Sequence, residues 1–201
     1  MVDETSKSKI LLAARSVFLR KGLAGARMQE IADTAGINKA LLHYYFGNKE
    51  SLFTSSFQSL LKEILPRFFG VFTTNLSFEE KVHTLARNYV EFLSDHPQLP
   101  VMILSEIQRE PKRLLDQIQI GELIDLSTLQ HQLDEEAAQG NIRKISVAEF
   151  LINTISLLVF PFAAKPIFQN VMSFSDSQFQ KFIDQRKSSV SDFILNALKP
   201  H

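Results

Sequence analysis

The sequence contains no cysteine among its 201 residues. This absence excludes disulfide bonds, thiolate nucleophiles and cysteine-ligated zinc or iron–sulfur centres, and it is compatible with a reducing cytoplasm. Long hydrophobic runs are also scarce. The most apolar region, residues 150–164, is too short to span a bilayer and is interrupted by Asn153, Thr154, Ser156 and Pro161. The polar N-terminus lacks the apolar core of a secretory signal, so we expect a cytoplasmic protein with no membrane segment.

Catalytic and metal-binding motifs are lacking as well. The five histidines are scattered, and none has the His-Glu-x-x-His spacing of a zinc site. Neither a Gly-x-Ser-x-Gly elbow nor a phosphate-cradling glycine loop is present in the sequence. The sequence therefore predicts no enzymatic activity, no metal site and no cofactor.

Net charge is zero for the whole chain, but the charges are distributed unevenly. Residues 1–50 hold eight lysines and arginines against five acidic residues, a net charge of +3, which leaves −3 for the rest. Positive potential near the N-terminus favours a nucleic-acid partner there, although three charges alone decide little. A hydrophobic content of 45% with 22% charged residues is sufficient for a well-packed core.

Residues 28–49 carry the most informative pattern. Met28, Ile31, Ala32 and Ala35 repeat at i, i+3, i+4 and i+7, which predicts a short amphipathic helix. The following glycine can end that helix in the left-handed conformation, and Asn38 can cap a second helix. Two short helices joined by a tight turn form a helix-turn-helix, whose second helix enters the DNA major groove. An ordinary helical hairpin inside an all-α core is the alternative.

The second helix has two predicted faces. Leu42, Tyr45 and Phe46 share the inner face. The outer face is expected to carry Lys39, Ala40, Leu41, His43 and Tyr44. The lysine can reach a phosphate or a guanine edge, the two ring side chains can bond to phosphate or base edges, and the alanine and leucine can touch a thymine methyl.

A third helix is expected to follow, with Asn48 as its cap and Lys49 in its first turn. A phosphate near that terminus would meet free N–H groups, the positive end of the helix dipole and an ammonium group. These residues therefore extend the predicted interface beyond the second helix.

The segment from about residue 7 to residue 53 resembles the DNA-binding domain of the TetR (tetracycline repressor) family. The shared sequence motif is Ile31-Ala-x-x-Ala35-Gly36-Ile37-Asn38-Lys39-x-x-Leu42-x-x-Tyr45-Phe46-x-x-Lys49-Glu50-x-Leu52. Arg27, Ala40 and His43 depart from the residues common at those positions in the family, and Arg27 can serve the same phosphate. The resemblance implies an N-terminal three-helix domain whose DNA-binding residues are Arg27, Met28, Lys39, Ala40, Leu41, His43, Tyr44 and Lys49.

The rest of the chain is predicted to be all-α, without strand-like alternation. The first helix is expected over residues 5–21, and the helix after Asn48 is expected to kink or break at Pro66. Capping boxes are predicted at three pairs, and a long helix is predicted to begin at Pro111 and to end at Gly140. The three pairs are Ser77 with Glu80, Ser146 with Glu149 and Ser175 with Gln178.

The resemblance also implies two domains with different functions. Residues 1–48 would be the helix-turn-helix domain, and residues 49–201 a helical domain for effector binding and dimerisation. The last two long helices would pair two copies on a palindromic operator, with half-sites about 34 Å apart or a multiple of that. The alternative is that these helices are intramolecular core.

Phenylalanine is abundant beyond the N-terminal region. Fifteen of the 17 phenylalanines follow residue 50, where they either line an apolar cavity or fill the core. The expected effector-binding residues are Phe68, Phe72, Arg87, Tyr89, His131 and Phe150. The resemblance implies a transcriptional regulator, most commonly a repressor, that a small and largely apolar ligand releases from DNA. The alternative is a helical DNA-binding or interaction module with no small-molecule effector.

Overall fold

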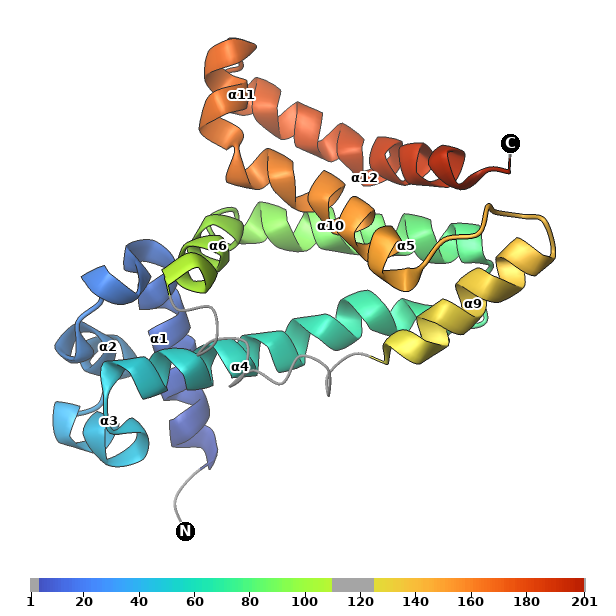
Figure 1. The fold of residues 1–201 in the computed structure, drawn as a ribbon. Helices are drawn as coiled ribbons and strands as arrows, with labels where there is room; N and C mark the ends of the chain where they lie inside the picture. Colours follow the sequence, from blue (N-terminus) through green and yellow to red (C-terminus); the bar gives the residue numbers. More distant parts are fainter. Residues whose placement is uncertain (1–3, 110–124, 201) are drawn as a thin grey trace. The chain divides into compact units, whose positions relative to one another are not determined.

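The computed structural model of the chain describes residues 4–109 and 125–200 (Figure 1). These residues form helices joined by short links, and no β-strand occurs among them, which confirms the predicted all-α fold. In chain order the helices are α1 (Glu4–Gly25), α2 (Met28–Ala35), α3 (Lys39–Phe46), α4 (Lys49–Phe69), the 3₁₀ turn η1 (Gly70–Thr73), α5 (Phe78–Asp95), α6 (Leu99–Arg109), α9 (Leu126–Ala138), α10 (Val147–Ala163), α11 (Lys165–Val171) and α12 (Asp176–Leu198).

The described residues fall into two compact units. The first consists of residues 4–64 and 101–109, and the second consists of residues 65–100 and 125–200. The division lies within α4, between Ile64 and Leu65. Each unit has its own buried apolar residues, so each is described by itself.

The core of the first unit is built from the predicted stripe of α1. Ile10, Ala14, Val17 and Phe18 are all buried, and the Phe18 ring meets the Phe53 ring edge to face at 5.0 Å. The helical conformation of α1 is interrupted where the sequence places its end, because Gly22 has a φ of 65°. That value lies in the left-handed region, which glycine adopts without steric cost.

The fold departs from the sequence prediction at Pro66. The sequence predicts a kink or a break there. A break is wrong, because α4 continues through Pro66 to Phe69 before the 3₁₀ turn begins, and a kink stays a prediction. Proline has no N–H group, so α4 continues through Pro66 without the backbone hydrogen bond that this residue would otherwise donate to the carbonyl four residues earlier.

A second departure concerns the long helix predicted to begin at Pro111. Residues 110–124 lie outside the described residues, but a helix that continues through Asp125 is wrong. Asp125 has an extended backbone and caps a new helix, α9, by accepting hydrogen bonds from the N–H groups of Ser127 and Thr128. An aspartate at this position, two residues before one free N–H group and three before the next, strongly favours the start of a helix. The sequence prediction overlooked this signal at Asp125.

The second unit is organised around α5 and α12, which pack along one another, with α10 in contact with both (Figure 1). Two of the three predicted capping boxes are complete, at Ser77 with Glu80 and at Ser175 with Gln178. The third is only half formed. The Ser146 hydroxyl accepts from the Glu149 N–H, but the Glu149 carboxylate accepts from Arg143 at 3.0 Å.

The short helix α11 has no counterpart in the sequence prediction. It follows α10 after a bend of 67°, with Pro166 in its first turn. Among the described helices, none is by itself both long and apolar enough to cross a membrane, and α10 with α11 meets that criterion only as this bent pair.

Candidate nucleic-acid interface

The predicted helix-turn-helix is present as α2 and α3. Gly36 ends α2 with a φ of 68° and a ψ of 33°, and its N–H points to the carbonyl oxygens of Ala32 and Asp33. Asn38 then begins α3, because its side-chain oxygen accepts from the Leu41 N–H at 2.7 Å. Ile31 and Ala32 of α2 and Leu42 and Phe46 of α3 are buried. The apolar periodicity and the two local caps therefore form the predicted turn.

The outer face of α3 is open to solvent. Lys39, Ala40, His43 and Tyr44 are exposed, and the Tyr44 side chain is 74% exposed. Leu41 is half-buried rather than fully outward, because it lies between the two faces of the helix. An exposed tyrosine of this size on a short helix offers an aromatic surface and a hydroxyl to a partner.

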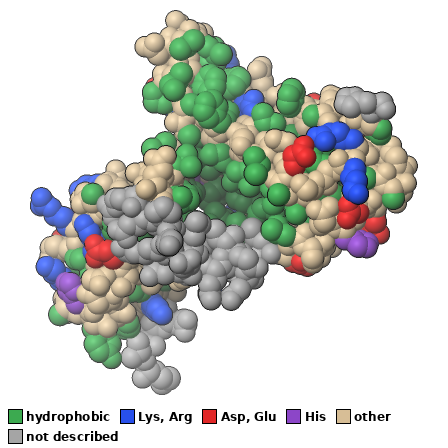
Figure 2. All heavy atoms as spheres, viewed as in Figure 1, with side chains coloured by type: hydrophobic (Ala, Val, Ile, Leu, Met, Phe, Trp, Pro, Cys, Tyr) green, Lys and Arg blue, Asp and Glu red, His purple; other side chains and the backbone are tan. Residues whose placement is uncertain are grey.

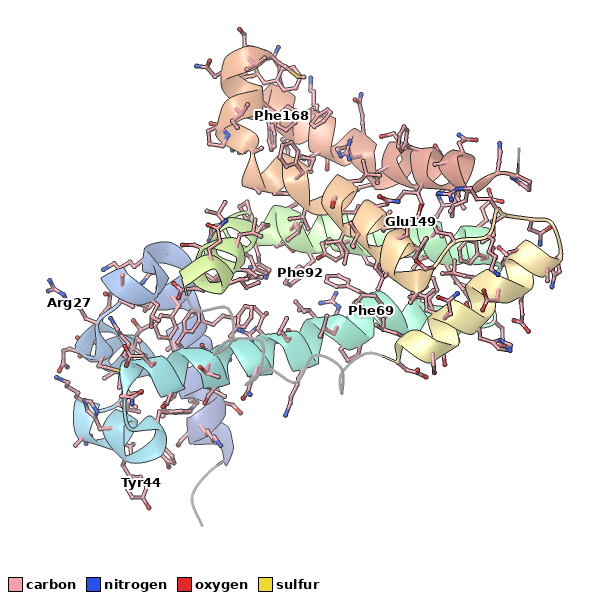
Figure 3. All side chains as sticks on the ribbon, viewed as in Figure 1. Arg27, Tyr44, Phe69, Phe92, Glu149 and Phe168 are labelled. Carbon is pink, nitrogen blue, oxygen red and sulfur yellow. The ribbon has the colours of Figure 1, made fainter. Side chains whose placement is uncertain are left out.

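Lys39 on this face and Arg27 just before α2 have no ionic partner among the described residues. Arg27 precedes α2 with an extended backbone, and its side chain caps none of the free N–H groups there. Neither Arg27 nor Lys39 forms an ion pair with another residue in the part of the chain that the structure describes. Figure 3 shows the Arg27 and Tyr44 side chains projecting away from the helices around them. Met28, the first residue of α2, directly follows Arg27 and is half-buried.

Other charges of the same unit are already compensated. Glu30 of α2 accepts from Lys21 at 2.8 Å and from Arg20 at 3.5 Å. Arg15 of α1 pairs with Glu63 of α4 at 2.9 Å. These pairs compensate part of the positive charge within the unit, whereas Arg27 and Lys39 keep their charges available to a partner.

His43 is held in a defined orientation. Its Nδ1 lies 2.6 Å from the carbonyl oxygen of Gly47, the residue that ends α3. A carbonyl can only accept, so Nδ1 carries the proton in this contact, and Nε2 is left as the free ring nitrogen. The histidine thus closes the end of α3 while it presents Nε2 outward.

Lys49 is engaged within the protein. Its ammonium donates to the carbonyl oxygen of Ala26 at 3.2 Å, in the link between α1 and α2, and to that of Ala24 at 3.4 Å, near the end of α1. Nothing local in the sequence connects residues 24–26 with residue 49, so sequence reasoning missed this interaction. The one signal in the sequence was a lysine in the first turn of a helix, where the dipole disfavours a cation.

The six residues expected to bind an effector do not form one group. Phe68 stacks on Tyr89 at 4.3 Å, and burial raises the pKa of Tyr89 to about 12. Phe72 and Phe150 meet edge to face at 6.2 Å. Arg87 and His131 are exposed, and His131 lies 3.4 Å from Glu135 on the surface of α9.

Hollows in the second unit involve two of these six residues. Phe72 lines a hollow of about 180 Å³ together with Pro66, Phe69 and Leu129. Phe150 lines another of about 320 Å³ between α10 and α12. Among the described residues, no three histidine, aspartate or glutamate side chains come close enough to hold a metal ion.

Comparison with known proteins gives the same interpretation of the N-terminal region. The family described as bacterial regulatory proteins, tetR family, matches residues 10–55. YhgD of Bacillus subtilis (strain 168), an HTH-type transcriptional regulator, is 34% identical over 100 residues, which are 50% of this chain and 52% of that protein. The chain thus aligns with about half the length of the curated relatives that it matches.

Solved structures match over nearly the whole chain. HlyIIR, a hemolysin II transcriptional regulator, is 27% identical, with a TM-score of 0.61 over 98% of this chain and 99% of that one. FadR of Bacillus subtilis, solved in complex with stearoyl-CoA, is 18% identical, with a TM-score of 0.70 over 95% and 98% of the two chains. The fold, the helix-turn-helix and these matches agree. Residues 10–55 of the chain belong to the tetR family of bacterial regulatory proteins.

Proposed function

We propose that the chain is a sequence-specific DNA-binding transcriptional regulator rather than an enzyme, and that it acts in the cytoplasm as a repressor. The observation that carries this proposal is the outer face of α3. Lys39, Ala40, His43 and Tyr44 are exposed together there, on the capped second helix of a helix-turn-helix. Membership of residues 10–55 in a family of bacterial regulatory proteins supports the same function.

The proposed contacts follow from the chemistry of each side chain. With α3 in the major groove, Lys39 reaches a phosphate or the acceptor edge of guanine, and Ala40 with Leu41 contacts thymine methyl groups. Tyr44 and the free Nε2 of His43 bond to phosphates or base edges. Arg27 and Met28 meet the backbone at the uncapped start of α2, where free N–H groups attract a phosphate. Lys49 was predicted to contact a phosphate, and its hydrogen bonds to backbone carbonyls make it the weakest member of the set.

We propose that the regulator is a homodimer. In this proposal residues 1–48 bind DNA, and residues 49–201 bind the effector and pair two protomers through α10 and α12. Exposed apolar side chains on those helices, Ile152, Phe160 and Phe193, support the pairing. Ile167, Val171 and Met172, on and just after α11, are exposed as well, and Figure 2 shows hydrophobic side chains gathered on this part of the molecule. A twofold pair doubles the few base contacts of one short helix on a palindromic operator.

We propose that a small and largely apolar molecule releases the DNA. The aromatic pairs around Phe68 and Tyr89, and those around Phe72 and Phe150, support an apolar ligand in the second unit. FadR, which has the same fold, was solved with stearoyl-CoA, and we extend an acyl chain to this protein as the first ligand to test. Such a ligand shifts the equilibrium by its difference in affinity for the DNA-competent and incompetent states.

One observation favours a DNA-binding module without an effector. Arg87 and His131, the polar residues expected to orient a ligand, are exposed and lie apart from the two aromatic groups. A ligand pocket needs a few polar groups that converge on it. This second candidate predicts the same DNA binding with no response to small molecules.

The test is fluorescence anisotropy with a labelled duplex from the region upstream of the chain's own gene. We expect dimeric, sequence-specific binding that weakens steeply with salt, and at least tenfold weaker binding for Lys39→Ala and for Tyr44→Ala. Lys62→Ala is the matched control, because Lys62 is an exposed lysine on α4. Parental affinity in both variants would refute the assignment of α3 as the recognition helix.

The effector test uses the same complex. Stearoyl-CoA is expected to lower the anisotropy of the labelled duplex, and coenzyme A without the acyl chain serves as its control. Release by both compounds would argue against an apolar site. No release by stearoyl-CoA or by free stearate would favour the module without an effector.

A further inference from the structure

The ring of His43 has one free nitrogen, and the structure fixes which one it is. Nδ1 lies 2.6 Å from the carbonyl oxygen of Gly47, and a carbonyl oxygen can only accept a hydrogen bond. Nδ1 therefore carries a proton in every state that keeps this contact. In the neutral ring the other nitrogen, Nε2, is then an acceptor, and in the charged ring it is a donor.

The position of His43 on α3 favours a DNA phosphate as the partner of Nε2. The residue is exposed and is the fifth of the eight residues of the helix, in its last turn. A recognition helix directs its N-terminal residues to the base edges, so a residue in the last turn lies closer to the sugar–phosphate backbone. Half or more of the hydrogen bonds between proteins and DNA go to that backbone.

A neutral His43 ring does not match a phosphate. Phosphate oxygens at neutral pH accept hydrogen bonds, and Nε2 of the neutral ring also accepts, so two lone pairs would face each other. The contact forms only when Nε2 is protonated. The resulting hydrogen bond joins a cation to an anion and is stronger than one between neutral groups.

No acidic residue of α3 is available to balance a charged ring at His43. Among the eight residues of the helix, the other charged side chain is Lys39, which precedes His43 by one turn and is exposed. The two neighbouring titratable residues, Tyr44 and Tyr45, are phenols. His43 forms no ion pair with any residue that the structure describes.

The acidic residues on the elements beside α3 do not supply that charge either. On α2, which packs against α3, Glu30 is paired with two cations of α1, and Asp33 accepts from the Gln29 amide at 2.8 Å. In the first turn of α4, Lys49 donates to backbone carbonyls and Glu50 is half-buried. The negative charge that would favour a protonated His43 therefore comes from the partner.

We propose that His43 binds a DNA phosphate through a protonated Nε2, so that each protomer takes up a proton when it binds the operator. The proposal rests on the DNA-binding function proposed above and adds the atom, its charge state and the DNA group that it contacts. Protonation and DNA binding then strengthen each other by the same factor. Operator affinity rises as the pH falls through the range in which histidine changes its charge.

The test measures operator affinity by fluorescence anisotropy at constant salt across this pH range. We expect the dissociation constant of the parent to be at least about tenfold lower at about pH 5.5 than at about pH 8. His43→Gln has an amide donor that does not titrate, and His43→Tyr has a ring with a neutral hydroxyl donor, so both are expected to lose most of this dependence. His96→Gln is the matched control, because His96 ends α5 in the second unit.

The salt dependence of binding identifies the DNA group. At about pH 5.5 the salt slope of the parent is expected to exceed that of His43→Gln by about 1 for each protomer, because the charged ring neutralises one more phosphate. At about pH 8 the two slopes are expected to be equal. If His43→Gln instead lost the same affinity at every pH, the proposal would be overturned and Nε2 would be assigned to the amino group of a base.

Nitrogen-15 NMR of the histidine rings tests the structural premise without DNA. At about pH 8 the free protein is expected to show His43 with its proton on Nδ1, in a signal that is absent from His43→Gln. A proton on Nε2 at that pH would overturn the proposal.

Failure of this inference is separable from failure of the proposed function. Operator binding whose pH dependence is the same in the parent and in His43→Gln keeps the function and refutes the inference. No operator binding at any pH, with the proton still on Nδ1 in the free protein, refutes the function and with it the phosphate contact.

Discussion

The Lys49 ammonium lies 3.2 Å from the carbonyl oxygen of Ala26, a residue 23 positions earlier in the chain. This hydrogen bond ties the first turn of α4 to the link between α1 and α2, immediately before Arg27. The lysine expected at the DNA phosphate therefore has a structural role inside the first unit. It fixes the backbone from which Arg27 and the start of α2 are presented.

Lys49→Met is predicted to destabilise the protein by about 1–2 kcal/mol, because two backbone carbonyls are deprived of a charged donor. Urea unfolding of the variant and of Lys62→Met, an exposed control on α4, measures this. DNA affinity measured against salt separates the roles. Replacing a lysine that binds a phosphate, as proposed for Lys39, lowers the salt slope by about 1, whereas replacing Lys49 is expected to leave the slope unchanged. If Lys49→Met instead lowered the salt slope and kept the parental free energy of unfolding, Lys49 would have to be counted among the residues that bind DNA.

The ion pair between Arg15 and Glu63 is predicted to respond unequally to removal of its two members. The Arg15 side chain is only 14% exposed and its Nε has no hydrogen-bond partner among the described residues, whereas Glu63 is 55% exposed. Glu63→Ala leaves a buried cation uncompensated. It is expected to lower the free energy of unfolding by about 1–3 kcal/mol after allowance for solvent screening. Arg15→Met returns the carboxylate to water and is expected to cost less than about 1 kcal/mol. Equal costs in urea unfolding would contradict this account.

Asp125 is predicted to make stability depend on pH in the acid range. Hydrogen bonds from the side chains of Ser127 and Thr128 lower the pKa of this carboxyl from 3.8 to about 2. The native state therefore binds the proton less readily than the unfolded state does, and the contribution of Asp125 is complete above about pH 4. It is lost as the pH falls from there through about 2.

The measurement compares urea midpoints of the parent and Asp125→Ala across this range. The difference between the two is expected to be constant from about pH 7 to about pH 5 and to shrink below about pH 4. A difference that stays constant down to about pH 2.5 would show that the carboxylate charge does not matter to the cap.

Two helix starts are predicted to differ in their sensitivity to removal of the cap. Ser77 belongs to a complete capping box, in which the Glu80 carboxylate accepts from the Ser77 N–H at 2.8 Å. Ser146 caps α10 alone, because Glu149 is paired with Arg143. Ser77→Ala is expected to lower the free energy of unfolding by about 1–2 kcal/mol, and Ser146→Ala by about 0.5–1 kcal/mol. The reverse order in thermal unfolding would argue against reciprocal capping at α5.

Several features could be predicted from the sequence because their causes are local. Gly36 and Asn38 act on backbone groups within four residues of themselves, so the turn between α2 and α3 is encoded where it forms. The buried faces of α1 and α2 follow from residues spaced three and four apart on one helix. The same reasoning found the boxes at Ser77 and Ser175.

Predictions failed where a residue had a choice of partners. Glu149 lies three residues after a serine, as a capping box requires, but Arg143 from the preceding loop takes its carboxylate. The roles of the eight DNA-facing residues and of the six effector residues remain predictions.

By itself, then, the sequence determined the all-α character, the helix-turn-helix and the exposed ring of Tyr44, since periodicity and caps act within one or two turns of a helix. Only the tertiary structure decided that Lys49 faces the carbonyls of residues 24 and 26, and that Phe193 stands beside an open groove. Those relations join residues that are distant in the chain. They depend on how whole helices pack, which no short stretch of sequence encodes.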